Sequence, residues 1–590
     1  MGIRGCDRRA NHGCEHGIGS TLMPKADCST HPARAPWAAI VLALCSCVLP
    51  AGAHARTHHS KRNPTLQPIL NYISAGWDAL TRSTTSCAGV ADAKLSEPSV
   101  LYFPADFAIP SAMKTLSSQC GIRVQHLPFL ISSPREVRSG IQPPGLLFLP
   151  NPYVVPGGRF NEMYGWDSYF IIRGVLRQGK IDLARGMVEN FFFEIEHYGA
   201  LFNANRTYYL TRSQPPFLTS MIMAVYEADK ARGQASHSWL ARAYDYANRD
   251  YQMWMGEAHR AGTTGLARYY DFGEGPVPEG LRDEVGYYQD VLQYFFSRDK
   301  HSPYLIAADS KDVLPYPQFS LETCEGKVSP TTKQCQAPQY VGLSREYYKG
   351  DRSMRESGFD VSFRFGPYGA DTHHYAPVCL NSLLYKTEAD LEKMSTWLGD
   401  KNAAVHWHAR AEKRKEIIRS LLWNAQRAMF FDYEFQDKKL SSYDYATTFY
   451  PLWAGVATTA QARAVASNLH EFEHQGGAAM STQNTGVQWD YPYGWAPIQL
   501  LAVEGLRRYG YNADADRISY EFLSMVLANF QRDGNIREKY NVVTDSSNIE
   551  VAEGYRSNVI GFGWTNAVFL ELLKALPQNG LNRLVTPSPH

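Results

Sequence analysis

Apolar side chains recur at steps of three and four residues from about residue 67 to 576, which is the period of a helix with one buried face. The stretch from 181 to 198 shows it clearly, placing these residues on one face: Leu183, Met187, Val188, Phe191, Phe192 and Ile195. The pattern predicts about a dozen helices in sequential pairs: roughly 168–179, 181–198, 216–231, 237–258, 283–297, 378–395, 401–423, 444–456, 460–471, 497–510, 512–530 and 562–576. Strand patterns are few and confined to the early part, as in Val100–Phe103.

No motif of about 34 or 40 residues repeats, so a helical solenoid is not expected. A dozen unlike helices with long connections favour one closed double ring of helices. The connections are rich in Gly, Pro, Trp, Asn and Gln, and loops on a rigid scaffold are where functional sites concentrate. We therefore expect the helices to be structural and the loops to carry the chemistry.

The charge balance and the aromatic content of the chain limit the kinds of molecule that it can bind. The 590 residues include 59 Lys plus Arg and 58 Asp plus Glu, which gives a formal net charge of +1. This near-neutral charge argues against nucleic acid as the main partner, because binding phosphates needs an excess of basic residues. Aromatic residues make up 13% of the chain, which excludes disorder. Tyr and Trp have an apolar face and a polar edge, and they suit surfaces that bind amphipathic ligands such as sugars.

The N-terminal segment resembles a secretory leader. The apolar run Trp37–Leu49 has thirteen residues, fewer than the roughly 20 needed to span a bilayer. Arg34 precedes this run and the small-x-small sequence of residues 53–55 follows it. We predict that residues 1–55 are a signal peptide and that the mature protein is periplasmic or secreted, without membrane association.

Two alternatives stay open for this segment: a start at Met23, and twin-arginine export through Arg8-Arg9. Beyond the leader, residues 56–66 are expected to form a flexible N-terminal segment. We predict one helical catalytic domain over 67–576 and a C-terminal tail over 577–590, acting as a monomer.

Five cysteines lie beyond the predicted leader, and export would permit disulfides. Cys324 and Cys335 bracket a polar loop and are the best candidate pair, while Cys87 and Cys120 are a second candidate. Cys379 is then left as a buried thiol. Spacing alone leaves the connectivity open.

The most informative loop is Pro156-Gly-Gly-Arg-Phe-Asn-Glu-Met-Tyr-Gly-Trp-Asp-Ser-Tyr-Phe170. Arg159 offers a fork of donors, Trp166 a stacking face and Asp167 a strong acceptor, and together these groups can hold a polyol. The alternative is a helix start with Asp167 as its cap and Trp166 as a core residue.

Two further loops have a similar character. Residues 203–216 contain two arginines, two asparagines and two tyrosines just before a predicted helix. Residues 488–497 contain a second Trp-Asp pair beside Gly and Pro at a helix start. The adjacent His373 and His374 would face different directions on a helix, and no Asp, Glu or Cys lies at metal spacing. We interpret them as structural or rim residues and expect no metal.

The two Trp-Asp segments resemble the two signature patterns of the glycoside hydrolase family 37 trehalases, and the similarity extends from about residue 70 to 575. The resemblance implies an all-α fold, an (α/α)6 barrel or six-hairpin toroid with decorated loops and little β structure. It also implies hydrolysis of the disaccharide α,α-trehalose to two glucose molecules, with inversion and without a cofactor.

Inverting hydrolysis needs a general acid and a general base roughly 6.5–9.5 Å apart. The segment 356–364 is similar to the family's acid segment and implies that Asp360 is the acid, whose pKa apolar neighbours such as Phe359 and Phe363 would raise. The segment 536–542 is similar to the base segment and implies that Glu538 activates water. Lys539 would favour the ionised form of Glu538 if the two side chains point the same way.

The resemblance also implies a set of sugar contacts: Arg159, Trp166, Asp167, Asn203, Arg212, Ser213, Gln214, Glu279 and Gly358. Two departures from the family pattern bear on the substrate. Val277 stands where the family has a sugar-binding arginine, and residues 548–558 replace a run of glycines, with Glu553 as the best-placed substitute for a substrate-binding glutamate.

These departures keep two alternatives in view. One is the same chemistry on another α-glucoside or on a modified trehalose, and the other is a trehalose-binding sensor without turnover. A helical interaction scaffold would not explain the Trp-Asp loops.

Overall fold

The computed structural model describes residues 65–92, 98–137, 140–279, 286–324, 337–551 and 557–586, together with 329, 331 and 335. The chain divides into residues 1–60 and a second unit, residues 61–590, and only the second unit contains described residues. The predicted signal peptide and Glu553 lie outside the described residues. Within the described part, no helix has both the length and the apolar character needed to cross a bilayer.

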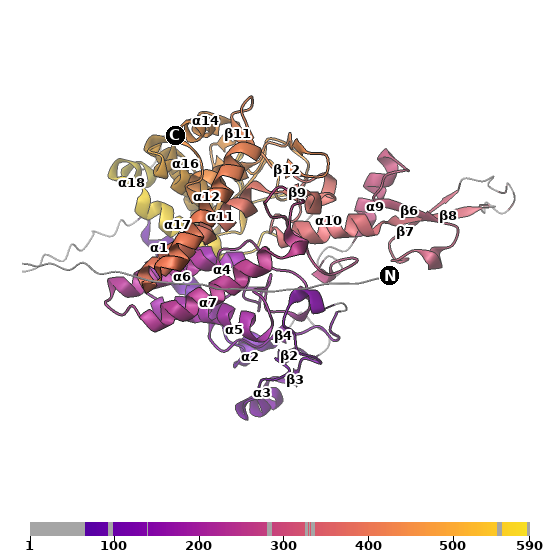
Figure 1. Ribbon diagram of the computed structural model, residues 1–590, viewed down its shortest axis with the longest axis horizontal. Helices are drawn as coiled ribbons and strands as arrows, with labels where there is room; N and C mark the ends of the chain where they lie inside the picture. The colour runs from indigo at the N-terminus through magenta and orange to yellow at the C-terminus, as the bar shows by residue number, and fades with distance from the viewer. Residues whose placement is uncertain are drawn as a thin grey trace, which may run out of the picture. The chain divides into compact units, whose positions relative to one another are not determined.

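Helices form most of the second unit (Figure 1). Their bounds are α1 Gln67–Leu80, α2 Cys87–Val90, α3 Ala112–Cys120, α4 Gly165–Arg177, α5 Ile181–His197, α6 Leu218–Ala231, α7 His237–Trp254, α9 Tyr287–Arg298, α10 Arg345–Glu356, α11 Val378–Leu398, α12 Lys401–Leu421, α13 Tyr450–Ala454, α14 Thr459–Ser467, α15 Ala496–Arg508, α16 Asn512–Asp533, α17 Gly563–Ala575 and α18 Gln578–Val585. The helix α18, within the predicted C-terminal tail, packs against α16.

Six of the described helices form a closed inner ring. Each contacts the next in the order α4, α6, α11, α13, α15 and α17, and α17 returns to α4. The inner helices are buried on nearly all sides, as α15 illustrates, whereas the outer helix α12 buries only one face. The helices α5, α7, α12 and α16 pack outside the ring. This arrangement confirms the predicted (α/α)6 barrel.

Local sequence explains the individual helices. The predicted helix at 181–198 is α5, whose apolar face is buried. The helix α15 begins with Pro497 in its first turn and ends with two arginines, the arrangement that the helix dipole favours. The helix α10 was not predicted, because most of its charged side chains are buried in polar contacts and leave no apolar stripe.

Strands are short, and their bounds are β1 Thr81–Arg82, β2 Val100–Phe103, β3 Arg123–His126, β4 Leu146–Leu147, β5 Tyr153–Val154, β6 Leu305–Ala308, β7 Ser320–Cys324, β8 Pro338–Leu343, β9 Tyr375–Ala376, β10 Trp423–Asn424, β11 Met429–Phe430, β12 Tyr433–Glu434, β13 Lys439–Leu440, β14 Glu473–His474, β15 Gly477–Ala478, β16 Tyr493–Trp495 and β17 Lys539–Asn541. In the first sheet, β2 pairs in parallel with β3 and β4.

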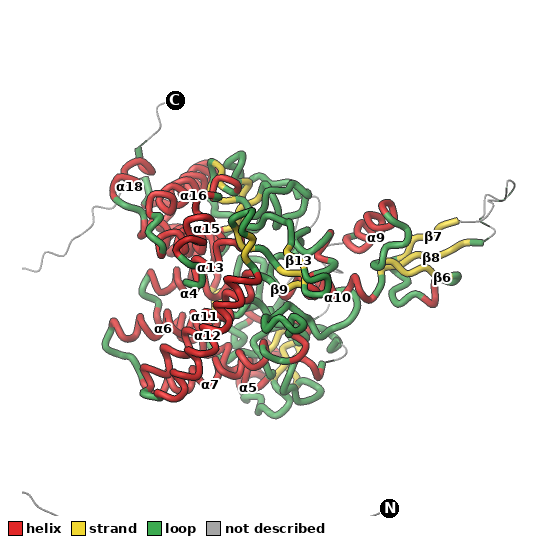
Figure 2. The backbone as a smooth tube through the Cα atoms, turned by 45° about the horizontal axis from the view of Figure 1, so that its top comes forward, coloured by secondary structure: helices red, strands yellow, loops and turns green. Residues whose placement is uncertain are grey.

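The expectation that strands are confined to the early part is wrong. The strands β6, β8 and β7 form an antiparallel sheet beside α9, seen at one edge of the tube in Figure 2. Much of β6 and β7 is exposed or half-buried, so these strands lack the alternation of apolar and polar residues that reveals a strand in sequence.

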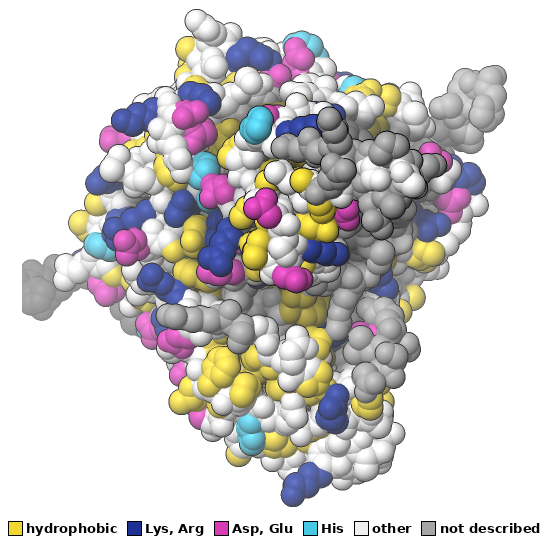
Figure 3. Space-filling view, turned by 90° about the vertical axis from the view of Figure 1, so that its right-hand side faces the viewer, with side chains coloured by type: hydrophobic (Ala, Val, Ile, Leu, Met, Phe, Trp, Pro, Cys, Tyr) yellow, Lys and Arg dark blue, Asp and Glu magenta, His cyan; other side chains and the backbone are white. Residues whose placement is uncertain are grey.

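The predicted cysteine pairing is confirmed. Disulfides join Cys87 to Cys120 and Cys324 to Cys335, while Cys379 is a buried thiol on α11. On the face drawn in Figure 3, the acidic and basic side chains of the described residues are interspersed, in keeping with the net charge near zero.

Candidate active site

A pocket lies where several inner helices begin, and aromatic rings with a few polar groups line it, as in many small-molecule sites. Trp166 and Asp167 come from the first turn of α4, and Trp564 comes from the start of α17. The loops before α6 and α15 and the residues after α10 complete it. Its lining is Pro156, Phe160, Tyr164, Trp166, Asp167, Asn203, Tyr209, Arg212, Gln214, Arg355, Gly358, Asp360, Gln488, Trp489, Trp495, Glu538, Phe562 and Trp564.

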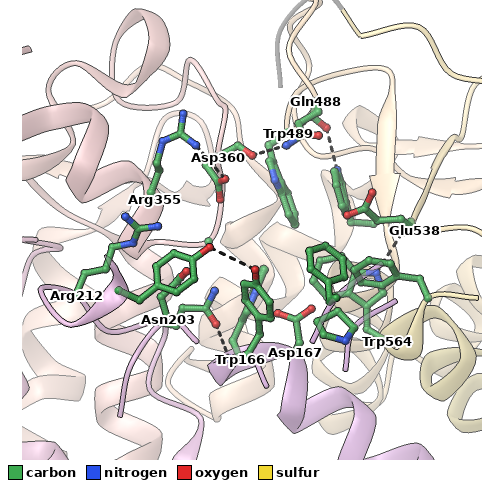
Figure 4. A pocket seen from close by; sticks show the side chains of 18 residues that line it. Trp166, Asp167, Asn203, Arg212, Arg355, Asp360, Gln488, Trp489, Glu538 and Trp564 are labelled. Atoms are coloured by element: carbon green, nitrogen blue, oxygen red, sulfur yellow. Dashed lines mark hydrogen bonds and ion pairs between the residues drawn. The ribbon is translucent and has the colours of Figure 1, made fainter. Parts of the chain in front are cut away.

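Asp360 and Glu538, the predicted acid and base, lie on opposite sides of this pocket (Figure 4). The Asp360 side chain is 18% exposed, and its Oδ2 lies 3.8 Å from Nη1 of Arg355. Its backbone carbonyl accepts a hydrogen bond of 2.5 Å from Nε2 of Gln488. Asp360 is thus held through its main chain, while its carboxyl group faces the pocket.

Gly358 sets the path of the chain into Asp360. Its φ of +75° lies in the left-handed region that favours glycine. A Cβ at this position would stand 3.0 Å from the indole ring of Trp166. Glycine therefore meets two requirements here, a backbone conformation and close contact with the pocket wall.

Glu538 has a buried cation beside it. Nζ of Lys539 lies 3.1 Å from Oε2 of Glu538, so the two side chains point the same way. Burial lowers the pKa of Lys539, while the Glu538 carboxylate opposes that effect. The backbone carbonyl of Glu538 accepts a hydrogen bond of 3.1 Å from Nε1 of Trp564, which fixes the base against the aromatic wall.

Asp167 is the third carboxyl group in the pocket. Burial raises its pKa well above the ordinary range, and the neighbouring carboxylates of Glu538 and Asp360 add to the rise. The protonated form of Asp167 can donate a hydrogen bond, in addition to accepting one as the sequence analysis expects. The helix α4 has no side-chain cap, so the alternative in which Asp167 caps this helix is not supported.

Four tryptophans form the aromatic wall. Trp489 and Trp495 are stacked with ring centroids 3.8 Å apart, and Trp166 lies 5.8 Å from both Trp489 and Trp564. Such a surface offers an apolar platform for a sugar ring. Trp166 both lines the pocket and belongs to the apolar core.

Arg212 is held by acidic neighbours behind the pocket. It forms a close ion pair with Glu279, and its Nη1 lies 3.7 Å from Oδ2 of Asp271. The Nε and Nη1 groups of Arg212 are buried without a hydrogen-bond partner in the protein. Glu279 lies outside the lining and orients Arg212.

The structure places the remaining predicted residues in two groups. Asn203, Gln214 and Gly358 line the pocket, and Oε1 of Gln214 accepts a 2.9 Å hydrogen bond from the Trp166 amide. Arg159 and Ser213 lie outside the lining. The guanidinium of Arg159 stacks 4.7 Å from the centroid of Phe160, whose ring does line the pocket.

Ser213 and Val277 contact other parts of the protein and do not line the pocket. The Ser213 amide donates a 3.2 Å hydrogen bond to Oε1 of Glu356, which ties the loop before α6 to the end of α10. Val277 is buried in an apolar cluster with Tyr287 and Tyr288, away from the pocket lining. A missing donor at position 277 is therefore not a gap in the pocket wall.

Sequence reasoning missed several lining residues. Arg355 precedes the acid segment by one residue, and Trp564 lies within the Gly-Phe-Gly-Trp-Thr-Asn sequence at 561–566. Their adjacency to those segments was the available signal. Tyr164 and Tyr209 meet across the pocket, with their hydroxyls 3.3 Å apart, a contact between distant segments that the sequence does not reveal.

A closed double ring of helices around a tryptophan-lined pocket with opposed carboxyl groups defines a glycosidase of the (α/α)6-barrel class. Within that class, the family model described as Trehalase matches residues 130–308 and 330–577. The chain therefore belongs to the trehalase family.

Individual proteins similar to this chain are also trehalases. A probable trehalase of Eremothecium gossypii is 35% identical over 555 residues, covering 84% of this chain and 71% of the relative. A cytosolic neutral trehalase of Beauveria bassiana is 37% identical over 480 residues, covering 74% of this chain and 60% of the relative. The solved neutral trehalase of Saccharomyces cerevisiae has 32% identity and a TM-score of 0.71, covering 88% of this chain and 96% of that one.

The same relatives correct the predicted location. Those from Beauveria bassiana, Neurospora crassa and Saccharomyces cerevisiae are cytosolic neutral trehalases. The predictions of a signal peptide and of a periplasmic or secreted protein are therefore wrong. A short apolar run does not by itself distinguish a signal peptide from other short apolar segments. The prediction of a signal peptide relied on such a run.

Proposed function

We propose that this protein hydrolyses α,α-trehalose by a single inverting displacement, with Asp360 as general acid and Glu538 as general base. The observation that carries the proposal is the placement of these two carboxyl groups on opposite sides of one pocket. Inverting hydrolysis needs that arrangement, because water must attack the sugar carbon from the face opposite the departing oxygen.

Hydrolysis takes place in one displacement step. Glu538 takes a proton from water, and the water oxygen bonds to the anomeric carbon of one glucose. The bond from that carbon to the bridging oxygen breaks, and the bridging oxygen takes the proton of Asp360. One β-glucose and one α-glucose leave, and proton exchange with solvent restores both carboxyl groups.

The surrounding residues support recognition of a neutral disaccharide. The tryptophan wall offers apolar contact, while Asn203 and Gln214 offer amide groups and Arg212 offers a guanidinium group. Arg355 places a second guanidinium at the pocket, close to the acid. All these groups come from one chain, which is in keeping with the predicted monomer, and light scattering of the pure protein would check that state.

The proposal is tested by incubating the protein with trehalose and with a panel of other glucose disaccharides. We expect glucose release from trehalose, and loss of at least about 100-fold in rate for Asp360→Asn and for Glu538→Gln. Release from another disaccharide but not from trehalose would support the alternative substrate. Trehalose binding without turnover in the wild type would instead support a sensor.

A further inference from the structure

His373 and His374 converge on one carboxylate outside the pocket. Both lie in the short 3-10 helix Thr372–His374, which packs against α10. Oε1 of Glu346, in the first turn of α10, lies 2.9 Å from Nε2 of His373 and 3.0 Å from Nε2 of His374. The partner that local sequence spacing did not show thus lies 27 residues upstream of His373.

We propose that Glu346, His373 and His374 form a binding site for a divalent transition-metal ion, with zinc as the best match. Two imidazole nitrogens and one carboxylate oxygen are ligands that zinc takes, whereas calcium and magnesium prefer oxygen ligands alone. One ligand atom from each residue lies within 4.8 Å of the others.

The two nitrogen-to-oxygen distances are close to those of tetrahedral coordination. Bonds of 2.0–2.1 Å place neighbouring ligand atoms of a tetrahedral zinc ion about 3.3 Å apart. The two nitrogen-to-oxygen distances here need to widen by only a few tenths of an ångström. Water would complete the shell, because a three-residue site leaves one position open.

The surroundings hold the ligands and leave access. Nη1 of Arg268 donates a 2.8 Å hydrogen bond to the backbone carbonyl of His373, which fixes the chain at the site. Nδ1 of His374 lies 3.8 Å from Oδ1 of Asp371, beyond hydrogen-bond distance but on the side of the ring where carboxylates support metal-binding histidines. The Glu346 side chain is 45% exposed, so an ion can reach it from solvent.

Binding there would connect the two ends of the segment that carries the acid. The chain runs from Glu346 along α10, through Gly358 and Asp360, and returns at His373. None of the three ligands lines the pocket, so the ion would stabilise this segment and take no part in hydrolysis.

The test is isothermal titration of the untagged, chelator-treated full chain with zinc chloride. Glu346→Gln and His374→Gln each remove one ligand. His408→Gln is the matched control, since His408 contacts Glu392 at 3.2 Å without a second histidine. We expect one saturable site in the wild type and in the control, weakened at least about tenfold in each ligand variant.

Two outcomes would overturn the proposal: no saturable binding in the wild type, or equal zinc binding in all four proteins. The second would place the ion elsewhere, for example at His12 and His16 in the N-terminal segment. Thermal unfolding without metal checks that each variant is folded, and a rise of its midpoint with zinc is expected only for the wild type and the control. Trehalose hydrolysis should persist after chelation, which keeps this test separate from that of the catalytic proposal.

Discussion

Nζ of Lys539 lies 3.1 Å from Oε2 of Glu538, and both side chains are buried. A general base must be ionised to accept a proton from water. Burial removes water from a carboxylate, and this loss of hydration raises the free energy of its charged form. The neighbouring ammonium group offsets that cost. The chain order Glu-Lys therefore places the base and its supporting cation together on the segment at β17.

Replacing Lys539 by Met should reduce hydrolysis. The buried Glu538 carboxylate would lose its ion pair with the Lys539 ammonium group, 3.1 Å away. We expect kcat/KM to fall by roughly tenfold or more. Lys539→Arg keeps the charge and is the control, and an unchanged kcat/KM in Lys539→Met would refute this role.

Asp167→Asn should change stability and activity in opposite directions. The folded protein raises the pKa of Asp167, so it retains a proton that the unfolded chain releases. This group therefore favours folding below the ordinary carboxyl pKa and opposes folding as pH rises above it. At pH 7, the neutral Asn should raise the thermal midpoint, whereas lost contact with the sugar should lower kcat/KM about 10- to 100-fold.

The measurement for this variant is thermal unfolding from pH 4 to pH 8 beside the wild type. The stabilisation by Asn should grow with pH across that range. An unfolding midpoint lower than that of the wild type at pH 7 would show that Asp167 is ionised in the folded protein.

Gly358→Ala should reduce both stability and activity. The left-handed backbone costs about 1–2 kcal/mol for alanine, and the added methyl group pushes on Trp166 in the pocket. Gly399→Ala is a matched control, because Gly399 has a φ of +80° with no neighbouring atom within 4 Å of the added Cβ. Both variants should unfold at lower denaturant concentration, but only Gly358→Ala should lose hydrolysis, and equal activities would exclude a role for the Trp166 contact.

The sequence predicted those parts of the fold that depend on local patterns. The apolar face at 181–198 became α5, and the Trp-Asp loops brought Trp166, Asp167 and Trp489 into one pocket. About a dozen unlike helices with long connections also favoured the double ring, which the structure confirms.

Features that depend on tertiary contact were not predicted. Arg355 lies on α10, where charged side chains are buried among polar partners, and a pattern based on polarity treats such residues as exposed. Glu279 was expected to contact sugar, but it binds Arg212. The convergence of His373 and Glu346 needs two segments to meet in space, and sequence spacing does not record that meeting.

We predict that Asp360 and Glu538 hydrolyse trehalose with inversion, and proton NMR of the first products distinguishes inversion from retention. Before the anomers equilibrate, the wild type should release α-glucose and β-glucose in equal amounts, and Asp360→Asn and Glu538→Gln should each slow that release about 100- to 10,000-fold. Early formation of α-glucose alone, or undiminished hydrolysis in either variant, would contradict the account.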